Sequence, residues 1–382
     1  MKNYRYGVGL MSGTSLDGID AALVKLTDSG LKTQVELIEF ASLDLDESMR
    51  NRIMALVDPK TSNIVELTSV NLELGYLFSK AVKEVLDKSN FQEKLDFVAS
   101  HGQTIYHIPN PEEGHIRSTL QIGDPSPIAY EHKVPVVFNF RMMDIVAGGE
   151  GAPLVPYTEL VLYKDSNKNR LLQNIGGIGN VTVLNKDANL EDVWAFDTGP
   201  GNMMMNAAVE HFYQEAYDKD AQYGLQGKLI PELMEELKCD PYLDIQPPKS
   251  TGREYYTKDN VEKLCKKYPF ANDIIYTLTY FTAYSIAQSY KRFIFSKVEV
   301  DEIILGGGGA YNPLLVSLIS EMLPGYKVMV QEDLGFSSDA KEAIAFAILG
   351  NDTLSHQNNN APLATGAKHP VILGQIQPNP IN

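Results

Sequence analysis

RLLQNIGGIGNVTVLN, residues 170–185, is the stretch that decides the fold, because it joins two apolar segments through a glycine-rich turn. The apolar segments predict two β-strands, and VWAFDTGPGN (193–202) predicts a third strand that runs into a helix at Met203. The N-terminus has the same order, with a strand over 4–12, the turn GTSLDG and a strand over 19–26. This weak repeat of pattern, not of identity, predicts two related α/β units.

Helical patterns, with apolar residues at three- and four-residue spacing, follow each hairpin. They predict helices over 46–57, 63–88, 203–217, 228–238, 258–267, 271–296 and 339–350, and a helix that ends at 323. Further strands are predicted over 97–105, 134–140, 301–305 and 326–334. We expect two α/β domains that face each other across a central cleft, residues 1–140 and 141–382. This expectation leaves room for the C-terminal segment to pack back on the first domain.

Composition and charge limit the classes of function. The 382 residues carry a formal net charge of −16, which excludes binding of nucleic acid or anionic lipid through bulk electrostatics. The two cysteines, Cys239 and Cys265, indicate neither a disulfide framework nor a structural zinc site. The apolar run at the N-terminus is too short for a signal peptide, and no later run is long enough to span a bilayer. We therefore expect a soluble, cytoplasmic protein.

Three glycine-rich segments are candidate nucleotide-binding elements: GTSLDG (13–18), NIGGIGN (174–180) and GGGG (306–309). The first two are equally compatible with ordinary hairpin turns. As a phosphate site, GTSLDG would supply backbone N–H groups and hydroxyls, while Asp17 or Asp20 would help to hold Mg²⁺ through water. The four glycines of GGGG indicate a ligand or a close backbone approach. Neither a P-loop nor a GxGxxG dinucleotide fingerprint is present.

Polar residues after predicted strands are candidates for the chemistry. Asp197 is either a general base or a brace of the Gly-Pro-Gly turn, beside which Asn202 is expected as an N-cap. The side chains of His101, Gln103 and Thr104 could hydrogen-bond sugar hydroxyls, although a lone histidine is more often structural.

Two further segments present candidate anion donors. Arg141 and Asp144 are expected at the end of the strand 134–140, where the arginine would suit a carboxylate or a phosphate. The loop PPKSTGRE (247–254) is either simply solvated or presents Lys249, Ser250, Thr251 and Arg253 to an anion.

Nine segments together resemble the anhydro-N-acetylmuramic acid kinase family. They are GLMSGTSLDGID, ASHGQT, QIGDPS, FR…D…AGG.GAPLVP, NIGGIGNVT, FDTGPGN, PPKSTGRE, GGGGAYN and DAKEAIAFA, in order from residue 9 to about 350. The resemblance implies two duplicated actin/hexokinase-like (ribonuclease H-like) domains that bind ATP with Mg²⁺. It also implies ATP-dependent phosphorylation of 1,6-anhydro-N-acetylmuramic acid with hydrolytic opening of the anhydro bridge, in peptidoglycan recycling, by a homodimer.

The resemblance assigns roles to individual residues. Asp197 becomes the base that activates water, and no protein ligand set for a metal is expected. The sugar would be lined by His101, Gln103, Thr104, Arg141 and Asp144, with Arg141 or Arg253 suited to the lactyl carboxylate. The expected nucleotide contacts are Ser12, Gly13, Thr14, Ser15, Leu16, Asp17, Gly18, Ile19, Asp20, Gly176, Gly177, Gly307, Gly308 and Glu342.

Three positions depart from the family pattern: Asn139 stands in place of Asp, Asn206 in place of an acidic residue, and Gly179 in place of Ala. Each amide removes a charge but keeps hydrogen-bonding capacity. Because Asp197 is retained, an active enzyme is expected. A non-catalytic sugar or nucleotide sensor, and a kinase of another sugar, are the alternatives.

Overall fold

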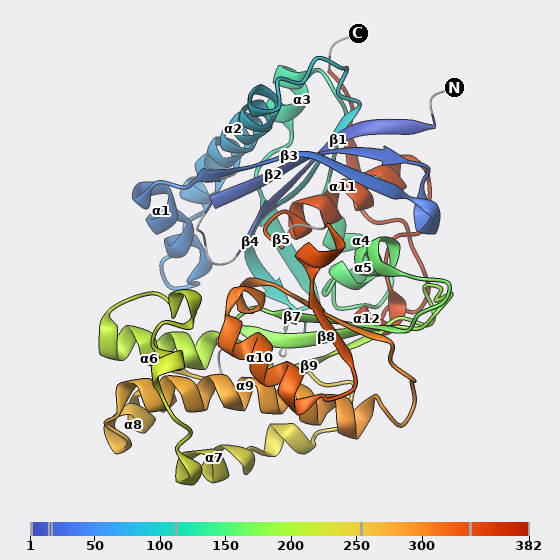
Figure 1. The fold of residues 1–382 in the computed structure, drawn as a ribbon. Helices are drawn as coiled ribbons and strands as arrows, with labels where there is room; N and C mark the ends of the chain where they lie inside the picture. The colour runs from blue at the N-terminus through green and yellow to red at the C-terminus, as the bar shows by residue number, and fades with distance from the viewer. Residues whose placement is uncertain are drawn as a thin grey trace. The chain divides into compact units, whose positions relative to one another are not determined.

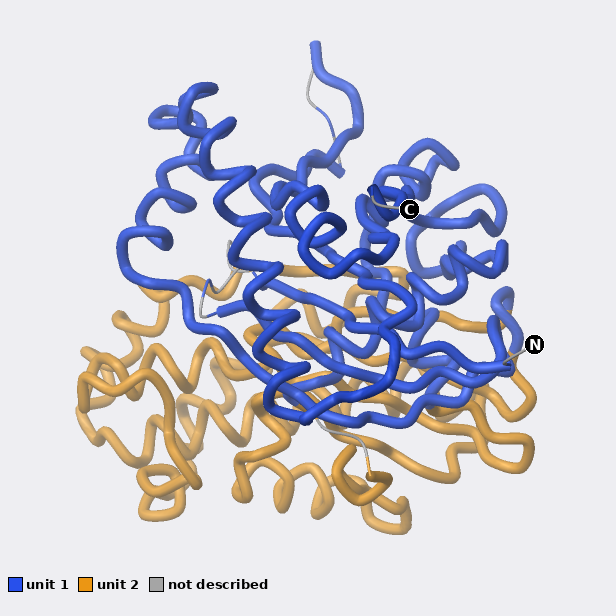
Figure 2. The backbone as a smooth tube through the Cα atoms, turned by 90° about the horizontal axis from the view of Figure 1, so that it is seen from above, with its two compact units in different colours: residues 1–162, 189–191, 339–382 blue, residues 163–188, 192–338 orange. Residues whose placement is uncertain are grey.

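The computed structural model describes residues 3–13, 16, 18–109, 111, 114–252, 255–335 and 338–380. It divides the chain into two compact units, residues 1–162 with 189–191 and 339–382, and residues 163–188 with 192–338 (Figure 2). The first unit therefore extends beyond the expected boundary at residue 140. It also takes in the C-terminal segment, because helix α11 (Lys341–Leu354) packs on the strands of this unit.

The first unit is built on a mixed sheet, which has seven strands in the described part of the chain. Its central order is β3-β2-β1-β4-β6, with β12 at the edge beside β6 and β5 paired to β4. The first three strands are antiparallel, whereas β4 lies parallel to β1 and to β6. The strands are β1 (Tyr4–Ser12), β2 (Gly18–Thr27), β3 (Gln34–Asp44), β4 (Phe97–Ile108), β5 (Ser118–Ile122), β6 (Val136–Phe138) and β12 (Gln375–Gln377).

The second unit repeats this arrangement in the order β9-β8-β7-β10-β11. Again three antiparallel strands are followed by parallel ones, with β10 parallel to β7 and to β11. The strands are β7 (Arg170–Ile175), β8 (Ile178–Leu184), β9 (Trp194–Pro200), β10 (Glu302–Gly306) and β11 (Lys327–Val330). The repeat inferred from the sequence is therefore confirmed, and so is a duplicated α/β fold.

Helices cover both faces of the first sheet (Figure 1). Alternate side chains of β2 point to opposite faces: Leu23 packs with α1, α2 and α3, whereas Val24 packs with α5 and α11. The helices are α1 (Glu47–Val57), α2 (Ile64–Lys88), α3 (Ser126–His132), α4 (Phe140–Val146), α5 (Val155–Tyr163), α11 and α12 (Pro362–Thr365).

The core of the second unit lies between its sheet and a helical layer in which α9 runs along β9 (Figure 1). Leu171, Val181 and Phe196 of the sheet pack there against Leu278 and Leu315 of the helices. The helices are α6 (Met203–Tyr213), α7 (Pro231–Lys238), α8 (Lys258–Lys267), α9 (Ala271–Phe293) and α10 (Pro313–Met322).

Two glycines allow α11 to lie directly on the first sheet. A Cβ at Gly9 would be 1.9 Å from the Ala343 carbonyl oxygen, and one at Gly350 would be 2.6 Å from the Ala99 Cβ. The close approach fixes the first turn of α11, which carries Glu342, relative to β1. A buried ion pair of 2.5 Å between Lys341 and Glu159 holds the same turn to α5.

The structure differs from the sequence expectations at a few elements. The strand predicted over 134–140 ends at Phe138, and Phe140 already begins α4. The predictions do not include strands β3, β5 and β12 or the short helices α3, α4, α5 and α12, and α6 ends at Tyr213, earlier than expected. Among the described residues, no helix has both the length and the apolar character that crossing a bilayer requires.

Candidate active site

Asp197 lies inside β9 at a β-bulge, and not at the strand end where it was expected. Asn180 pairs with Asp197 and Gly179 pairs with Gly199, so Thr198 is the extra residue on β9. Bulges bend a strand and redirect its side chains, and they are frequent beside active sites. The bulge thus sets the direction of the Asp197 carboxylate by a departure from regular pairing.

The segment 249–251 holds Asp197 at two points. The Asp197 N–H donates to the Lys249 carbonyl oxygen at 3.1 Å, and the Thr251 N–H donates to Asp197 Oδ2 at 2.9 Å. The Tyr242 hydroxyl donates to the Asp197 carbonyl oxygen at 2.9 Å. The main chain of Asp197 is therefore fixed, and Thr251 directs one carboxylate oxygen.

Burial raises the pKa of Asp197 to about 6. The Thr251 N–H and the positive charge of Lys249 act in the opposite direction, since both favour the carboxylate. At neutral pH the group is therefore ionised, with a basicity well above that of an ordinary aspartate. A carboxylate in this state is suited to accept a proton from water.

The turn after β9 is tied to the β7–β8 turn by main-chain bonds. The N–H groups of Gly201 and Asn202 donate to the carbonyl oxygens of Gly177 and Gly176, at 2.9 and 2.7 Å. A Cβ at Gly201 would lie 2.1 Å from the Gly176 oxygen, so this position requires glycine. Asn202 precedes α6, but its side chain makes no cap bond and donates instead to the Ile175 carbonyl oxygen at 3.3 Å. Asn202 thus stands at the expected N-cap position of α6, but without the side-chain bond that an asparagine usually contributes there.

The glycines of GGGG divide into two kinds. A Cβ at Gly306 would meet Gln331 at 2.4 Å, one at Gly309 would meet Ile175 at 2.3 Å, and Gly307 has a φ of +78°. Close backbone approach and left-handed backbone therefore account for three of the four glycines. Gly308 is exposed, and the nearest atom to its Cβ would be Asn202 Nδ2 at an ordinary 3.5 Å.

Gly176 and Gly177 resemble Gly308 in this respect. A Cβ at Gly176 would have its nearest neighbour at 3.7 Å, and one at Gly177 would have it at 4.0 Å. Gly176 and Gly177 lie in the turn between β7 and β8. Gly306, two residues before Gly308, pairs with Asn174, which lies in β7 close to that turn. Three glycines that the fold does not require thus lie just after the carboxyl ends of the neighbouring strands β7 and β10. A ligand could approach the backbone there.

In the first unit, the residues that flank the β1–β2 turn are joined to β4. Ser12 Oγ lies 2.7 Å from Gln103 Oε1 and 3.1 Å from the Gly18 carbonyl oxygen, and both Ser12 and Gln103 are buried. Thr104 Oγ1 accepts a bond from Gln121 Nε2 at 3.2 Å. Gly13 lies in the described part of the turn, whereas the predicted contacts Thr14, Ser15 and Asp17 lie outside the described residues.

The side chains of Leu16 and Ile19, two predicted nucleotide contacts, belong to the core that α1, α2 and α3 form on the sheet. Any contact between either residue and a nucleotide would therefore come from its backbone.

Arg141 lies on α4, and not at a strand end as expected, and it is held by two bonds. Its Nε donates to His101 Nε2 at 3.0 Å, and its Nη1 donates to the Gly151 carbonyl oxygen at 2.8 Å. Because His101 Nε2 accepts, Nδ1 carries the proton and donates to the Gly102 carbonyl oxygen at 2.8 Å. Burial and the charge of Arg141 lower the pKa of His101 to about 3, so the ring is neutral. His101 thus positions Arg141.

Asp144 is fully buried, and both of its oxygens are occupied. Oδ2 accepts from the Gly151 N–H at 2.9 Å, while Oδ1 accepts from Asn360 Nδ2 at 2.9 Å and from Thr365 Oγ1 at 2.8 Å. Asp144 therefore joins the loop that holds Arg141 to the C-terminal segment. Sequence reasoning placed Asp144 against the sugar and had no signal for Asn360 or Thr365.

Glu342 of the first unit interacts electrostatically with both Asp20 and Arg141. Partial desolvation raises the pKa of Glu342, and the charge of Asp20 adds to this effect, whereas Lys341 and Arg141 oppose it. Glu342 is exposed at the first turn of α11. Within the part of the chain that the structure describes, no three His, Cys, Asp or Glu side chains gather as a metal site.

The chain matches the family model of anhydro-N-acetylmuramic acid kinase over residues 5–379. It is 50% identical over 378 residues to the anhydro-N-acetylmuramic acid kinase of Clostridioides difficile strain 630, covering 98% of this chain and 99% of that protein. The chain belongs to the anhydro-N-acetylmuramic acid kinase family. The kinase of the same name from Francisella tularensis subsp. novicida is 51% identical, with the same coverage of 98% and 99%.

A solved ROK family glucokinase from Streptomyces griseus, in complex with glucose and AMPPNP, is a more distant likeness. It aligns with 90% of this chain, and with 99% of its own, at 10% identity and a TM-score of 0.40. The family assignment rests on the two kinases and on the family model.

The departures from the pattern of the anhydro-N-acetylmuramic acid kinase family have structural settings. Asn139 has a left-handed backbone with a φ of +54°, which asparagine tolerates better than most residues. Arg141 is held by its hydrogen bonds to His101 and Gly151, so an acidic group at 139 is not needed to hold it. A Cβ at Gly179 would lie 2.9 Å from Thr198 Oγ1, so an alanine at this position would require a local shift. Nothing in the structure explains Asn206.

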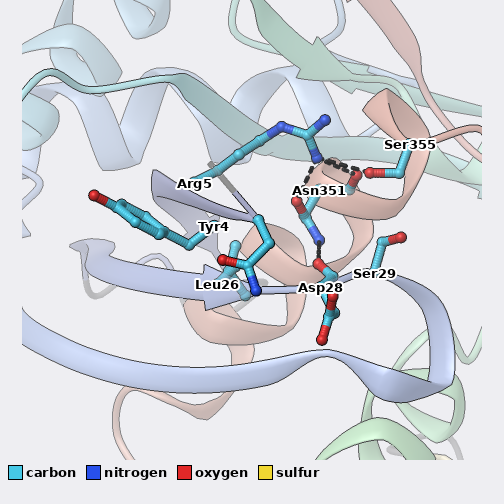
Figure 3. A pocket seen from close by; sticks show the side chains of 8 residues that line it. Tyr4, Arg5, Leu26, Asp28, Ser29, Asn351 and Ser355 are labelled. Atoms are coloured by element: carbon cyan, nitrogen blue, oxygen red, sulfur yellow. Dashed lines mark hydrogen bonds between the residues drawn. The ribbon is translucent and has the colours of Figure 1, made fainter. Parts of the chain in front are cut away.

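A cavity of about 200 Å³ lies in the first unit, at the other end of the β1–β2 hairpin. It is lined by Asn3, Tyr4, Arg5, Leu26, Asp28, Ser29, Asn351 and Ser355 (Figure 3). At the rise of a strand, Arg5 and Ser12 are roughly 20 Å apart along β1. The cavity is therefore separate from the β1–β2 turn, which was predicted to bind the nucleotide.

Proposed function

We propose that this protein catalyses ATP-dependent phosphorylation of 1,6-anhydro-N-acetylmuramic acid with hydrolytic opening of the anhydro ring. The products would be N-acetylmuramic acid 6-phosphate and ADP. Membership of the anhydro-N-acetylmuramic acid kinase family supports the substrate. The observation that carries the chemistry is Asp197, a single carboxylate directed by a bulge and with its pKa raised to about 6.

In the proposed reaction, Asp197 takes a proton from water while the water oxygen forms a bond to C1 of the sugar. The C1–O6 bond of the anhydro bridge breaks, and O6 keeps the electron pair. O6 then bonds to the γ-phosphorus of ATP, and the bond from this phosphorus to the oxygen of ADP breaks. One water, one anhydro sugar and one ATP are consumed, and the proton that Asp197 accepts returns to solvent afterwards.

We propose that the nucleotide contacts the backbone at the glycines that the fold does not require: Gly176, Gly177 and Gly308. Gly307 is proposed with them, as are the residues of the β1–β2 turn. Asp20 and Glu342 fit a magnesium ion that arrives with ATP, because Mg²⁺ keeps several waters and needs only one or two carboxylates beside the phosphates. The ion would neutralise charge on the phosphates during transfer.

We propose that the sugar is bound by Arg141, Thr104 and Gln103. Gln103 is also bonded to Ser12, beside the β1–β2 turn. The guanidinium of Arg141 suits the lactyl carboxylate, because a planar fork of donors matches two carboxylate oxygens. Burial lowers the pKa of Arg141 only to about 10, so it stays charged at neutral pH. His101 and Asp144 are proposed to position this arginine. Arg253, which lies outside the described residues, stays a proposed second anion donor.

We further propose a cytoplasmic homodimer that acts in peptidoglycan recycling. The product, a phosphorylated amino sugar, would enter amino-sugar catabolism.

The test supplies ATP, Mg²⁺ and 1,6-anhydro-N-acetylmuramic acid in ¹⁸O-labelled water. We expect ADP and a 6-phosphorylated reducing sugar whose mass shows one solvent oxygen at C1. ADP without sugar phosphate, or a sugar phosphate without the label, would contradict the proposal. Tight sugar binding by calorimetry with no turnover would instead favour a sensor. Turnover only with N-acetylmuramic acid or a hexose from a small panel would indicate another sugar kinase.

A further inference from the structure

Lys249 has an unusual environment for a lysine, because only 8% of the residue is exposed. Its ammonium lies 4.5 Å from the ring centroid of Tyr242, 4.9 Å from that of Phe293 and 6.0 Å from that of Phe196. Its Nζ donates to the Tyr242 carbonyl oxygen at 3.2 Å. The side chain therefore points into the second unit and does not present its charge to a ligand, as its loop position had suggested.

The three rings around the Lys249 ammonium come from three elements. The Lys249 side chain therefore fixes segment 249–251 relative to all three. Phe196 precedes Asp197 on β9, Phe293 ends α9, and Tyr242 lies in the 3₁₀ segment Pro241–Asp244. The carbonyl oxygen of Lys249 accepts the Asp197 N–H, and two residues further on the Thr251 N–H holds the carboxylate. Anchoring the Lys249 side chain thus places both groups that hold Asp197.

We propose that Lys249 is a positioning residue for Asp197: its ring-enclosed side chain fixes segment 249–251, and its positive charge keeps the carboxylate ionised. This inference rests on the proposed role of Asp197 as the base. No direct ion pair between the two is required, because the charge acts through the low-dielectric interior that the rings create.

The charges around this pair are few. Asp197 is faced by Lys249, by the Thr251 amide and by the Tyr242 hydroxyl, whose pKa is raised by burial so that it stays protonated. Lys249 is influenced by Arg292 of α9 and, with opposite sign, by Asp240 and Asp244. Among these, Lys249 is the positive group that acts on Asp197.

The fold itself does not benefit from the charge of Lys249. Burial is the main cause that lowers the pKa of its ammonium to about 8. The group is therefore still mostly charged at neutral pH, but keeping the charge in the interior costs folding free energy. The aromatic faces compensate part of this cost. A neutral side chain of similar length should therefore leave the fold as stable as before, or more stable.

The experiment compares wild type with Lys249→Met, which is one atom shorter, keeps most of the apolar packing and removes the charge. ¹³C NMR of labelled aspartate carboxyls would follow Asp197, with its signal assigned from Asp197→Asn. We expect the midpoint of the Asp197 titration to rise by about half a unit to one unit. We expect the melting temperature to stay equal or to rise. Lys297→Met is the matched control, because Lys297 lies 5.4 Å from the Trp194 ring but is exposed, and it should change neither quantity.

The same variants are then compared by kcat/KM between pH 5 and pH 9. The acid limb of Lys249→Met should move with the NMR midpoint, so that activity falls roughly three- to tenfold at pH 5 and little at pH 8. An unchanged Asp197 midpoint in a folded Lys249→Met variant would overturn the proposal. Because the NMR titration needs no turnover, a failure of the proposed reaction would be seen separately, as wild type without product.

Discussion

Two aspartates that the sequence predicts as site residues, one in each unit, have opposite surroundings. Asp144 is fully buried and accepts from three donors, one of them Asn360 at the far end of the chain. Asp197 accepts on its side chain from the Thr251 amide, and burial raises its pKa to about 6. A carboxylate that the fold has satisfied on both oxygens is a structural group. A carboxylate that the fold desolvates while offering it few hydrogen-bond donors has a raised pKa and is suited to proton transfer.

The largest effect is expected from Asp197→Asn. Loss of the base should lower kcat by about 10²- to 10⁴-fold. Stability should not fall, since the amide oxygen can still accept from Thr251 and no charge remains to be desolvated. Steady-state kinetics and thermal melting would measure both, and Asp187→Asn, at an exposed position with a φ of +54°, is the matched control. Full activity in Asp197→Asn would remove the distinction between the two aspartates.

The converse variant, Asp144→Ala, should act on stability. It would leave the Gly151 amide, Asn360 and Thr365 without their acceptor in the interior, which should lower the free energy of unfolding by about 3–5 kcal/mol. Urea unfolding measures this change. Asp144→Asn should lose less, because one oxygen acceptor remains. If Asp144→Ala were stable but inactive, Asp144 would belong with Asp197 as a reactive group.

The pH dependence of activity tests the state of Asp197 directly. Its folded pKa is raised, and the reaction needs the carboxylate, so kcat/KM should be constant above about pH 7 and halved near pH 6. Below that it should fall about tenfold for each pH unit. Circular dichroism at pH 5 would check that the protein stays folded. A limb near pH 4 would mean that desolvation of Asp197 has no functional consequence.

The smallest effects are expected at two glycines, of which one is required by the fold and the other is proposed to contact the nucleotide. Gly177→Ala has room for its methyl group, so stability should be retained while KM for ATP rises several-fold. Gly201→Ala would place a Cβ 2.1 Å from the Gly176 oxygen and should cost about 1–3 kcal/mol of stability. Thermal melting with nucleotide titration separates the two. An unchanged KM in Gly177→Ala would argue against a nucleotide at this turn.

The fold was largely predictable because its signal is local and occurs twice. Apolar strands joined by glycine turns mark both hairpins, and the same order of strands follows in each unit. Strands β3 and β5 were missed, since β3 has only partly buried and exposed residues and thus lacks a clear apolar pattern. The start of α4 at Phe140 was missed because Phe140 extends the apolar pattern of VPVVF beyond Asn139, where the backbone in fact turns left-handed.

The site was predictable in its residues but less so in their roles. Asp197 stands out in the sequence because it follows the apolar residues of a predicted strand and comes just before Gly-Pro-Gly. The roles of His101 and Asp144 depend on partners 40 and 216 residues away along the chain, which spacing cannot reveal. The burial of Lys249 likewise depends on Tyr242 and Phe293, which come from other elements.

The return of the C-terminal segment to the first unit has a consequence for synthesis. A ribosome that has reached residue 338 has supplied nearly everything that the second unit needs, whereas the first sheet still lacks α11 and β12. We therefore expect the second unit to complete its fold before the first, the reverse of the usual N-terminal-first order. Until the last few dozen residues emerge, the apolar face of β1 and β4 is a surface for chaperones. A premature stop in this segment should destroy the N-terminal half of the protein before it affects the middle.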